Sequence, residues 1–292
     1  MDVSVVIVNY NTCFLLLQCL NSIYQIVEGI DFEVIVVDNA SSDNSIQSVK
    51  DKFPQVILIE NSENIGFGRA NNLGVKYACG KYLFFLNSDT ILINNSIKQF
   101  YEAMEKVPLV AACGGNLLDG NGLATYSYGF FPNLLQEIFD CGLKFVFPSF
   151  YFYKLSINKV VQSETIPFEV DYICGADIFV RKSIFKQMGG FDEAYFMFYE
   201  ETDLFFRMKK KCFVSKIFPD INMIHLGGAS FQSNSNISKL IIMYKSKILF
   251  YKKSYSYFIL VLLKTLMIVS SLVHVRRYRG HVMNIVNTII KS

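Results

Sequence analysis

The chain has 292 residues, of which 52% are hydrophobic, and a formal net charge of +3. This length can bury a large core, so the chain is not a small scaffold that depends on disulfides or a structural metal. Its seven scattered cysteines include no CxxC pair, which argues against zinc binding and indicates reduced thiols in a cytoplasmic compartment. The first residues, Met1-Asp2-Val3-Ser4, have no basic segment, so we expect a strand there rather than a signal peptide.

Residues 1–90 alternate short β-branched segments with segments in which apolar residues recur at helical spacing. We predict strands at residues 3–8, 34–37, 56–59 and 82–86. Helices are predicted after Thr12, which can act as a cap, and at residues 42–52 and 68–78. This alternation predicts an α/β fold with a mostly parallel sheet and right-handed connections.

Two of the predicted strands end on polar side chains. Asp38 and Asn39 follow one strand, and Asn87-Ser88-Asp89 follow another. Open α/β sheets bind ligands at the carboxyl ends of their strands. The two strand ends are therefore expected to meet at one crevice and to hold a metal ion and a nucleotide.

Residues 91–220 have a more mixed pattern. We predict a helix at 97–106, short strands at 110–113 and 124–128, two more at 170–174 and 177–181, and a helix at 200–211. The aromatic segment 130–155 has no clear period, and we interpret it as an insertion that faces the acceptor. The only strong change in composition falls near residue 235.

Several motifs also allow purely structural interpretations. Gly66-Phe67-Gly68 begins like a dinucleotide fingerprint, but Asn71 stands where the third glycine belongs, so turn and cap chemistry is the alternative. Acidic residues at positions 200, 201 and 203 would also be favoured simply by a helix dipole. His225 precedes Gly227 and Gly228 and is either a ligand or a structural hydrogen-bonding residue.

Taken together, these clusters resemble the family-2 inverting glycosyltransferases of the GT-A fold, and most closely their rhamnosyltransferase-like branch. The resemblance covers about residues 2–235. It is carried by residues 6–11, 37–43, 61–72, 86–89, 175–176, 189–193, 200–204 and His225. It implies a Rossmann-like, mostly parallel sheet that is flanked by helices.

The resemblance also implies roles for individual residues. Asp38 would accept hydrogen bonds from the uracil or thymine imide, with Asn39 in support. The remaining donor-binding residues would be Asn9 and Asn11 beside the nucleoside, Asn64, Gly66 and Asn71 near the ribose and phosphates, and Asn87 and Ser88 after the strand. Asp89 would bind a divalent cation, Mg²⁺ or Mn²⁺, with His225 as its second ligand; hard cations prefer such oxygen-rich sites.

Inverting transfer requires one general base. The matching position is Glu201, where the family usually has Asp, and Glu200 and Asp203 are catalytic candidates in the same segment. Asn87 replaces the first aspartate of the family's Asp-x-Asp motif, which favours a rhamnosyl donor. Because the chain has no Trp, we expect Tyr172, Phe196 and Tyr199 to stack on sugar rings.

The end of the chain differs in charge from the rest. Residues 1–220 carry 18 basic and 25 acidic side chains, whereas the part after Asp220 carries ten basic and none acidic. Residues 257–275 contain Lys264 as their only charge, which favours an interfacial helix, with a spanning helix or a core-packed helix as alternatives. The apolar character of this tail favours an anionic membrane surface over nucleic acid as its partner.

We therefore expect a GT-A domain at residues 1–235, with a nucleotide-binding half at 1–90 and an acceptor half at 91–235, and a membrane-associating helical tail at 236–292. The resemblance implies inverting transfer of rhamnose from dTDP-rhamnose to a lipid-linked saccharide in surface polysaccharide synthesis. The enzyme would be peripheral, at the cytoplasmic face of the inner or plasma membrane. The alternatives are an inactive carbohydrate-binding or scaffold protein with the same fold, and a glycoside hydrolase, which needs two carboxyls but no nucleotide site.

Overall fold

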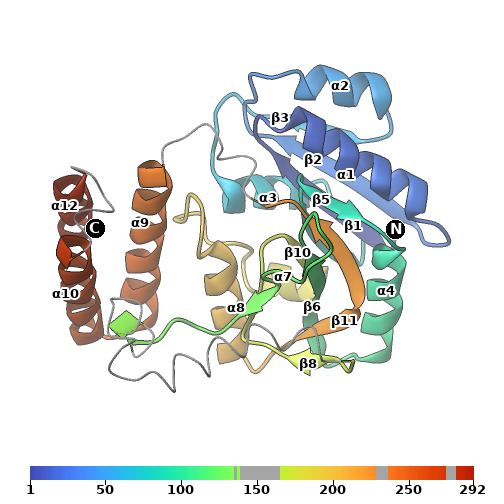
Figure 1. Ribbon diagram of the computed structural model, residues 1–292. Helices are drawn as coiled ribbons and strands as arrows, with labels where there is room; N and C mark the ends of the chain where they lie inside the picture. The colour runs from blue at the N-terminus through green and yellow to red at the C-terminus, as the bar shows by residue number, and fades with distance from the viewer. Residues whose placement is uncertain (135–136, 139–164, 228–235, 274–280) are drawn as a thin grey trace.

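A mixed nine-stranded sheet with helices on both faces forms the centre of the molecule, with the strand order β3-β2-β1-β4-β10-β6-β11-β5 and β8 paired to β11. Figure 1 shows this computed structural model, which describes residues 1–134, 137–138, 165–227, 236–273 and 281–292. The α/β class and the GT-A arrangement predicted from the sequence are confirmed.

The amino-terminal half of the sheet is parallel. Its strands are β1 (Val3–Asn9), β2 (Phe32–Asp38), β3 (Ile57–Glu60) and β4 (Tyr82–Asn87), connected by α1 (Cys13–Ile26), α2 (Ser45–Lys52) and α3 (Phe67–Val75). The register places Asn9 opposite Asp38 and Val8 opposite Asn87. The polar ends of three neighbouring strands therefore share one edge of the sheet.

The second half mixes directions. Its strands are β5 (Thr90–Leu92), β6 (Val110–Leu118), β8 (Phe168–Glu169), β10 (Asp177–Arg181) and β11 (Val214–His225), and its helices are α4 (Ser96–Lys106), α7 (Lys182–Gln187) and α8 (Glu200–Lys210). β10 runs antiparallel to both β4 and β6, and β11 runs antiparallel to β5. The β5–β11 pairing brings the end of β11 back to the end of β4.

Some predicted elements differ from the observed ones. The strand predicted at 124–128 is mostly loop: Ala124 forms an isolated bridge to Leu118, and only Tyr128 enters β7 (Tyr128–Gly129), which pairs with β9 (Tyr172–Ile173). Thr12 precedes α1 but makes no side-chain cap, because its hydroxyl donates to Asn9 Oδ1 at 2.7 Å instead. Most of the segment 130–155 lies outside the described residues.

The core consists of two layers, one on each face of the sheet. Because successive strand residues point to opposite faces, Phe84 packs with α1 and α4, whereas Phe85 packs with α3, α7 and α8. Both phenylalanines are fully buried. This double cover explains the continuous apolar run of β4, which holds the polar residues after it in a fixed place.

The carboxyl-terminal helices α9 (Asn236–Ser254), α10 (Tyr257–Val273) and α12 (Val282–Lys291) form a third apolar cluster beside α8. Phe250 of α9 is fully buried and packs against Tyr199 and Phe206. Within the residues that the structure describes, no helix is long and apolar enough to cross a membrane.

Candidate active site

A cavity of about 490 Å³ opens at the carboxyl ends of β1 and β4. Its walls come from the β4 end, the loop before α3, the Cys174–Ala176 turn, the segment that enters α8, His225 at the end of β11, and the start of α9. Of the residues predicted from the sequence, Asn39, Asn64, Gly66, Asn87, Ser88, Asp89, Glu200, Glu201 and His225 line it. Segments that are far apart in the sequence thus line one cavity.

Asp89 and His225 lie together at one wall of this cavity. Oδ1 of Asp89 is 3.2 Å from Nε2 of His225, and the same nitrogen is 3.3 Å from the amide of Asn87. The backbone fixes the pair, because the Leu226 N–H donates to the carbonyl of Asp89 at 3.0 Å. Both side chains are mostly buried, with 9% and 16% of their surface exposed.

This pair fits a divalent cation. Ligand bonds of about 2.0–2.2 Å place neighbouring ligand atoms roughly 3 Å apart, which matches the observed separation. Across the described part of the chain, no group of three or more His, Cys, Asp or Glu side chains is arranged to hold a metal. Asp89 and His225 would therefore supply two ligands, and a bound ligand or water would have to complete the coordination.

Asp38 is buried beside the cavity. Its Oδ2 accepts a hydrogen bond from the Asn9 amide at 2.8 Å, and its Oδ1 accepts one from the Ser41 N–H at 2.8 Å. Asn9 also donates to Ser41 Oγ at 3.1 Å. The structure thus brings Asn9 and Asp38 together, with the carboxylate held by its neighbours.

Asn11 lies at the exposed rim of the same turn. Its side-chain oxygen accepts from the Ser42 N–H at 2.7 Å, and its backbone is left-handed with φ 54°. Asn tolerates this conformation better than most residues. Asn11 therefore shapes the loop after β1 and does not line the cavity.

An amide network joins Asn39 to the loop before α3. Asn39 donates to Asn64 Oδ1 and to the carbonyl of Gly66, both at 3.2 Å. Gly66 has φ 89°, and a Cβ there would collide with the carbonyl oxygen of Phe196. Only glycine allows the backbone at position 66 to come this close to Phe196. Gly66 therefore lets the loop before α3 contact the segment that enters α8.

Asn71 belongs to helix α3. It is buried within α3, its amide donates to the Phe67 carbonyl at 3.1 Å, and it is not part of the cavity wall.

The entry to α8 is strained. Phe198 and Tyr199 both have positive φ, 66° and 69°, in front of Glu200 and Glu201. Non-glycine residues in this region cost of order 1–3 kcal/mol each, and such strain is typical of functional sites. The strained turn aims the first residues of α8 at the cavity.

Glu200 and Glu201 form a buried acidic pair at that point. Burial raises the pKa of Glu200 well above its usual range, and the neighbouring Glu201 carboxylate raises it further. Burial also raises the pKa of Glu201, to about 7, against the effect of backbone N–H donors at the helix start. The Oε2 atoms of both residues are buried and accept no hydrogen bond from any residue that the structure describes.

Such a pair can separate two roles. Burial favours the neutral form of both carboxyls, and Glu201, whose pKa is raised to about 7, can gain or lose a proton near neutral pH. A carboxylate with a pKa near the working pH is well suited to general base catalysis.

Asp203, the third acidic candidate, points elsewhere. Its Oδ2 accepts from Arg207 Nε at 2.7 Å, and Arg207 in turn donates to the carbonyls of Met188 and Gly190. Burial raises the pKa of Asp203, and Arg207 opposes that shift. Asp203 thus anchors the loop between α7 and α8, outside the cavity wall.

The aromatic residues expected near the sugar occupy three different places. Phe196 lines the cavity, Tyr199 packs on Phe250, and the hydroxyl of Tyr172 is hydrogen-bonded to that of Tyr126. The negative charge of Glu201 contributes to raising the pKa of Tyr172, behind the larger effect of burial. The Tyr126–Tyr172 pair therefore lies within electrostatic range of the acidic pair.

Several cavity residues were given no role by the sequence analysis, among them Tyr10, Cys174, Lys239 and Ile242. Tyr10 directly follows Asn9 and could have been found from the strand end. Lys239 and Ile242 belong to α9, whose return to the cavity depends on long-range packing that no local pattern shows.

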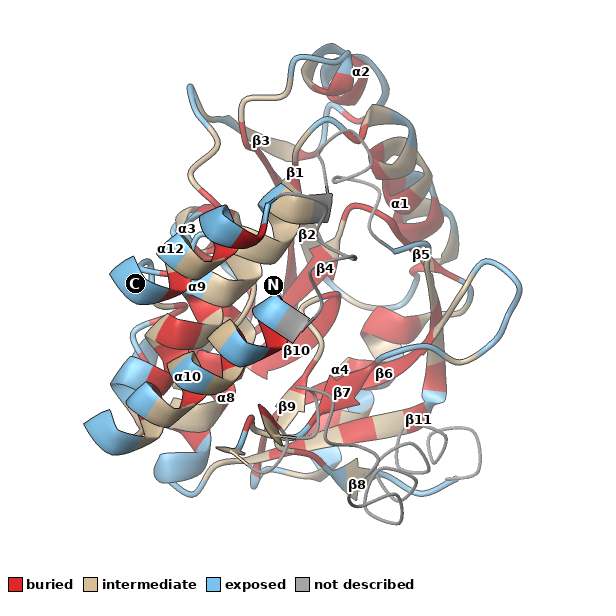
Figure 2. Cartoon of the chain, turned by 60° about the vertical axis from the view of Figure 1, so that its left-hand side comes forward, coloured by how far each residue is buried: buried red, intermediate tan, exposed pale blue. Residues whose placement is uncertain are grey.

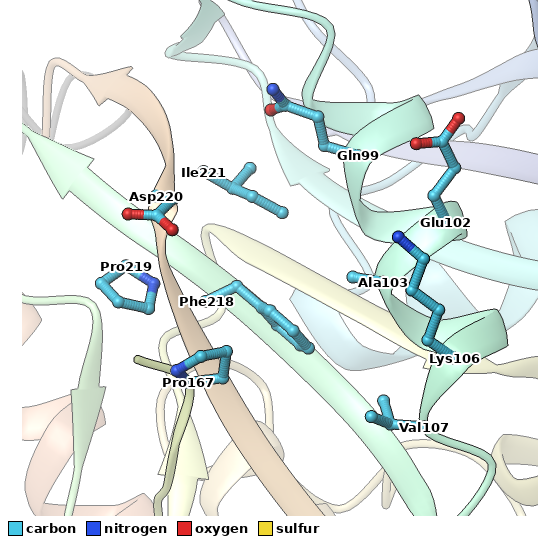
Figure 3. Close-up of a pocket in the computed structure, with 10 residues that line it drawn as sticks. All are labelled: Gln99, Glu102, Ala103, Lys106, Val107, Pro167, Phe218, Pro219, Asp220 and Ile221. Atoms are coloured by element: carbon cyan, nitrogen blue, oxygen red, sulfur yellow. The ribbon is translucent and has the colours of Figure 1, made fainter. Parts of the chain in front are cut away.

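A second hollow, of about 360 Å³, lies between α4 and the irregular part of β11 (Figure 3). Its lining includes Glu102, Lys106, Phe218 and Asp220. None of the predicted site residues belongs to it, so it has no part in the site described above.

The sheet carries Asp38 at the end of β2 and Asp89 after β4, and a buried acidic pair lies in the wall of the same cavity, which is an arrangement that suits a glycosyltransferase. The chain belongs to glycosyl transferase family 2, whose family model matches residues 4–189. The family predicted from the sequence is therefore confirmed.

Rhamnosyltransferases are among its relatives. The chain is 27% identical over 205 residues to an N-acetylglucosaminyl-diphospho-decaprenol L-rhamnosyltransferase of Mycobacterium tuberculosis, with 66% of each chain covered. It is 29% identical over 157 residues to rhamnosyltransferase WbbL of Escherichia coli, covering 49% of this chain and 54% of that one. The match thus spans just under two thirds of the first relative's length and about half of the second's.

Solved structures share the fold. The mannosyltransferase PcManGT of Pyrobaculum calidifontis, in complex with GDP-Man and Mn²⁺, has a TM-score of 0.60 at 16% identity, covering 99% of this chain and 73% of that one. GalNAc-T7 with UDP, GalNAc and Mn²⁺ has a TM-score of 0.62 at 14% identity, covering 86% and 48%.

Proposed function

We propose that this protein transfers a sugar, rhamnose from dTDP-rhamnose, to a lipid-linked saccharide acceptor during synthesis of a surface polysaccharide, with inversion at the anomeric carbon. The observation that carries the proposal is the occurrence of the Asp89–His225 pair and the Glu200–Glu201 pair in the walls of one cavity. A binding protein has no need of a buried acid whose pKa is close to 7.

The donor would lie along the β1–β2–β4 edge. Asp38 and Asn9 would face the base, with Asn39 and Asn64 nearer the ribose and Asn87 and Ser88 beside the diphosphate. Asn11, Asn71 and Asp203 would act through the loops and helices that they hold. This division agrees with the proposed nucleotide-binding half at residues 1–90 and acceptor half at 91–235.

Asp89 and His225 would hold a divalent cation, Mg²⁺ or Mn²⁺. When bound, the cation would neutralise negative charge on the departing nucleoside diphosphate. The solved relatives with Mn²⁺ support this part of the proposal.

Glu201 would act as the general base. It would take the proton from the acceptor hydroxyl as that oxygen bonds to the anomeric carbon and the bond to the diphosphate oxygen breaks. A single displacement of this kind inverts the anomeric carbon. Burial favours the neutral form of Glu200, which would limit the negative charge beside the base.

The acceptor is inferred from the relatives. The name of the mycobacterial enzyme specifies a diphospho-decaprenol acceptor, which is a lipid. We therefore infer that this chain works as a peripheral protein at the cytoplasmic face of the plasma membrane, with residues 236–292 as its membrane-associating part.

The test is a donor screen. The full-length protein is mixed with dTDP-rhamnose, UDP-sugars or GDP-mannose and Mg²⁺ or Mn²⁺, and nucleoside diphosphate release is measured with and without a polyprenyl-diphosphate-linked saccharide. We expect dTDP-rhamnose to be preferred and the product to have the inverted configuration by NMR. Release of no nucleotide from any donor would instead support an inactive binding or scaffold protein.

A further inference from the structure

The outward side of α10 is apolar although it faces solvent. The exposed residues Phe258, Val261, Thr265, Val269 and Leu272 recur every three or four positions, so they form one stripe along the helix. Its ends are strongly exposed, with 76% for Phe258 and 51% for Leu272. We name these five residues the α10 stripe.

The polar groups of α10 are turned away from the stripe or satisfied within the helix. Thr265, the only polar member, donates its hydroxyl to the Val261 carbonyl at 2.9 Å. Ser270 and Ser271 lie on the buried side with Leu263 and Met267. A helix on a water-exposed surface normally has the opposite distribution, with its polar residues outward.

Lys264 is the only charged residue of α10, and it is directed sideways. Its Nζ lies 3.5 Å from the carbonyl of Ile290 in α12. The stripe is thus free of charge along a helix of 17 residues, about 25 Å long.

Further apolar and basic side chains are exposed on α10 and on the helices next to it. Tyr257 is 80% exposed, and Met283 and Ile290 are exposed on α12. Helix α12 lies beside α10, and both helices have exposed faces (Figure 2). Lys252, shortly before α10, and Lys291, at the end of α12, are also exposed. The whole chain after Asp220 has ten basic residues and no acidic one. This charge is complementary to an anionic surface and opposes pairing with a second copy of itself.

We propose that the α10 stripe lies flat on an anionic lipid bilayer, with its apolar side chains in the interface and the surrounding lysines at the headgroups. Over its described residues, Tyr257–Val273, α10 is not long and apolar enough to cross a bilayer. An apolar face with basic flanks is typical of helices that lie in the interface. Binding to a bilayer rests on the proposed function in one respect: a lipid-linked acceptor would be presented to the enzyme at such a surface.

Helix α9 connects the stripe to the cavity. Its Lys239 and Ile242 line the cavity, while its Ile248 and Tyr251 belong to the apolar cluster that holds Leu260 and Leu263 of α10. The surface that binds lipid and the cavity that receives the acceptor are therefore parts of one packed unit.

The experiment is vesicle flotation of the full-length protein with phosphatidylcholine vesicles that contain or lack phosphatidylglycerol. The test variant is Phe258→Glu with Leu272→Glu. The matched control is Leu109→Glu with Ile166→Glu, which changes two residues that are 86% and 71% exposed far from α10 in the sequence.

We expect the wild type and the control to float with the anionic vesicles and to be partly released by salt. The test variant should bind roughly tenfold more weakly or worse, because two apolar anchors are replaced by like charges. Equal binding of the test variant and the wild type would overturn the proposal. The proposal would also be overturned if the wild type did not bind anionic vesicles, or if it formed a dimer through the stripe.

Donor-dependent nucleotide release without vesicles is measured on the same preparations, with circular dichroism to check folding. Absence of nucleotide release from the wild type would contradict the proposed function but would not affect the conclusion from vesicle binding. Normal release without vesicle binding would contradict the α10 assignment alone.

Discussion

Nε2 of His225 lies 3.2 Å from Oδ1 of Asp89 because the antiparallel pairing of β5 with β11 sets His225 opposite Thr90. Asp89 stands at the junction between β4 and β5, so the sheet itself fixes both partners. Two potential metal ligands that are remote in sequence are thereby held rigidly at one wall of the cavity.

Replacement of Asp89 tests this pair. We expect Asp89→Ala to lower kcat at least about 100-fold, because the cation would lose its carboxylate ligand and the leaving diphosphate its neutralising charge. Nucleotide release is measured across a range of Mg²⁺ and Mn²⁺ concentrations, with Asp51→Ala on the exposed side of α2 as the control. Full activity of the wild type in excess chelator would show that the assignment is wrong.

Replacement of Glu201 tests the general base. Glu201→Gln keeps the shape of the side chain but removes the proton acceptor, so kcat should fall about 10²–10⁴-fold with little change in donor affinity. Glu200→Gln should have a much smaller effect, because burial already favours the neutral form of Glu200. Wild-type kcat should rise with pH through about 7, where Glu201 loses its proton. If Glu200→Gln causes the larger loss, the base is Glu200.

The same pair makes a prediction about stability. The pKa of Glu201 rises from an ordinary 4.5 to about 7 on folding, so the folded protein holds a proton that the unfolded chain releases. The free energy of unfolding should therefore fall as pH rises from about 4.5 through 7.

We expect Glu201→Gln to be more stable than the wild type at pH 8, by up to about 3 kcal/mol, and equally stable at pH 4. Urea unfolding at the two pH values measures this difference, and Glu102→Gln on the exposed face of α4 is the control. A Glu201→Gln variant that is less stable than the wild type at pH 8 would contradict the raised pKa.

The parts of the fold that follow from local patterns were predicted well. The parallel half was predictable because its strands are apolar on both faces. Strand Asp177–Arg181 was predictable because its apolar run Ile-Phe-Val is bounded by charged residues. The strand predicted at 124–128 was wrong because this segment makes only scattered hydrogen bonds to β6, such as Thr125 N–H to the Leu117 carbonyl, and an isolated bridge from Ala124 to Leu118 instead of a continuous ladder. The left-handed turn at Phe198 and Tyr199 has no recognisable sequence pattern. The packing of α9 against the cavity has none either, because it depends on long-range contacts.

Lys239 is the clearest functional candidate that only the structure shows. It lines the cavity from α9, and its Nζ lies 5.9 Å from the centre of the Phe198 ring. A cation at this wall would attract a diphosphate group, so Lys239→Gln should raise the KM for the donor about tenfold and weaken its dependence on salt. Lys245→Gln, exposed on the same helix, is the matched control. An unchanged KM would show that Lys239 does not contact the donor.

Phe250 tests whether the terminal helices are part of the catalytic unit. It is fully buried between α9 and α8, and its ring centre lies 5.6 Å from that of Tyr199, which directly precedes the acidic pair. Phe250→Ala should lower the free energy of unfolding by about 3–5 kcal/mol, because a large cavity would remain in the cluster. It should also lower kcat, since the strained turn that aims Glu200 and Glu201 would lose its support.

Urea unfolding followed by both tyrosine fluorescence and circular dichroism measures the first effect, with Leu109→Ala, 86% exposed, as the control that should change little. A single transition shared by both probes is expected, because α9 packs directly on α8 through Phe250 and Phe206. Two separate transitions, with Phe250→Ala moving only one of them and leaving kcat intact, would show that residues 236–292 fold as an independent unit. In that case the position of Glu201 would depend on the residues before 236 alone.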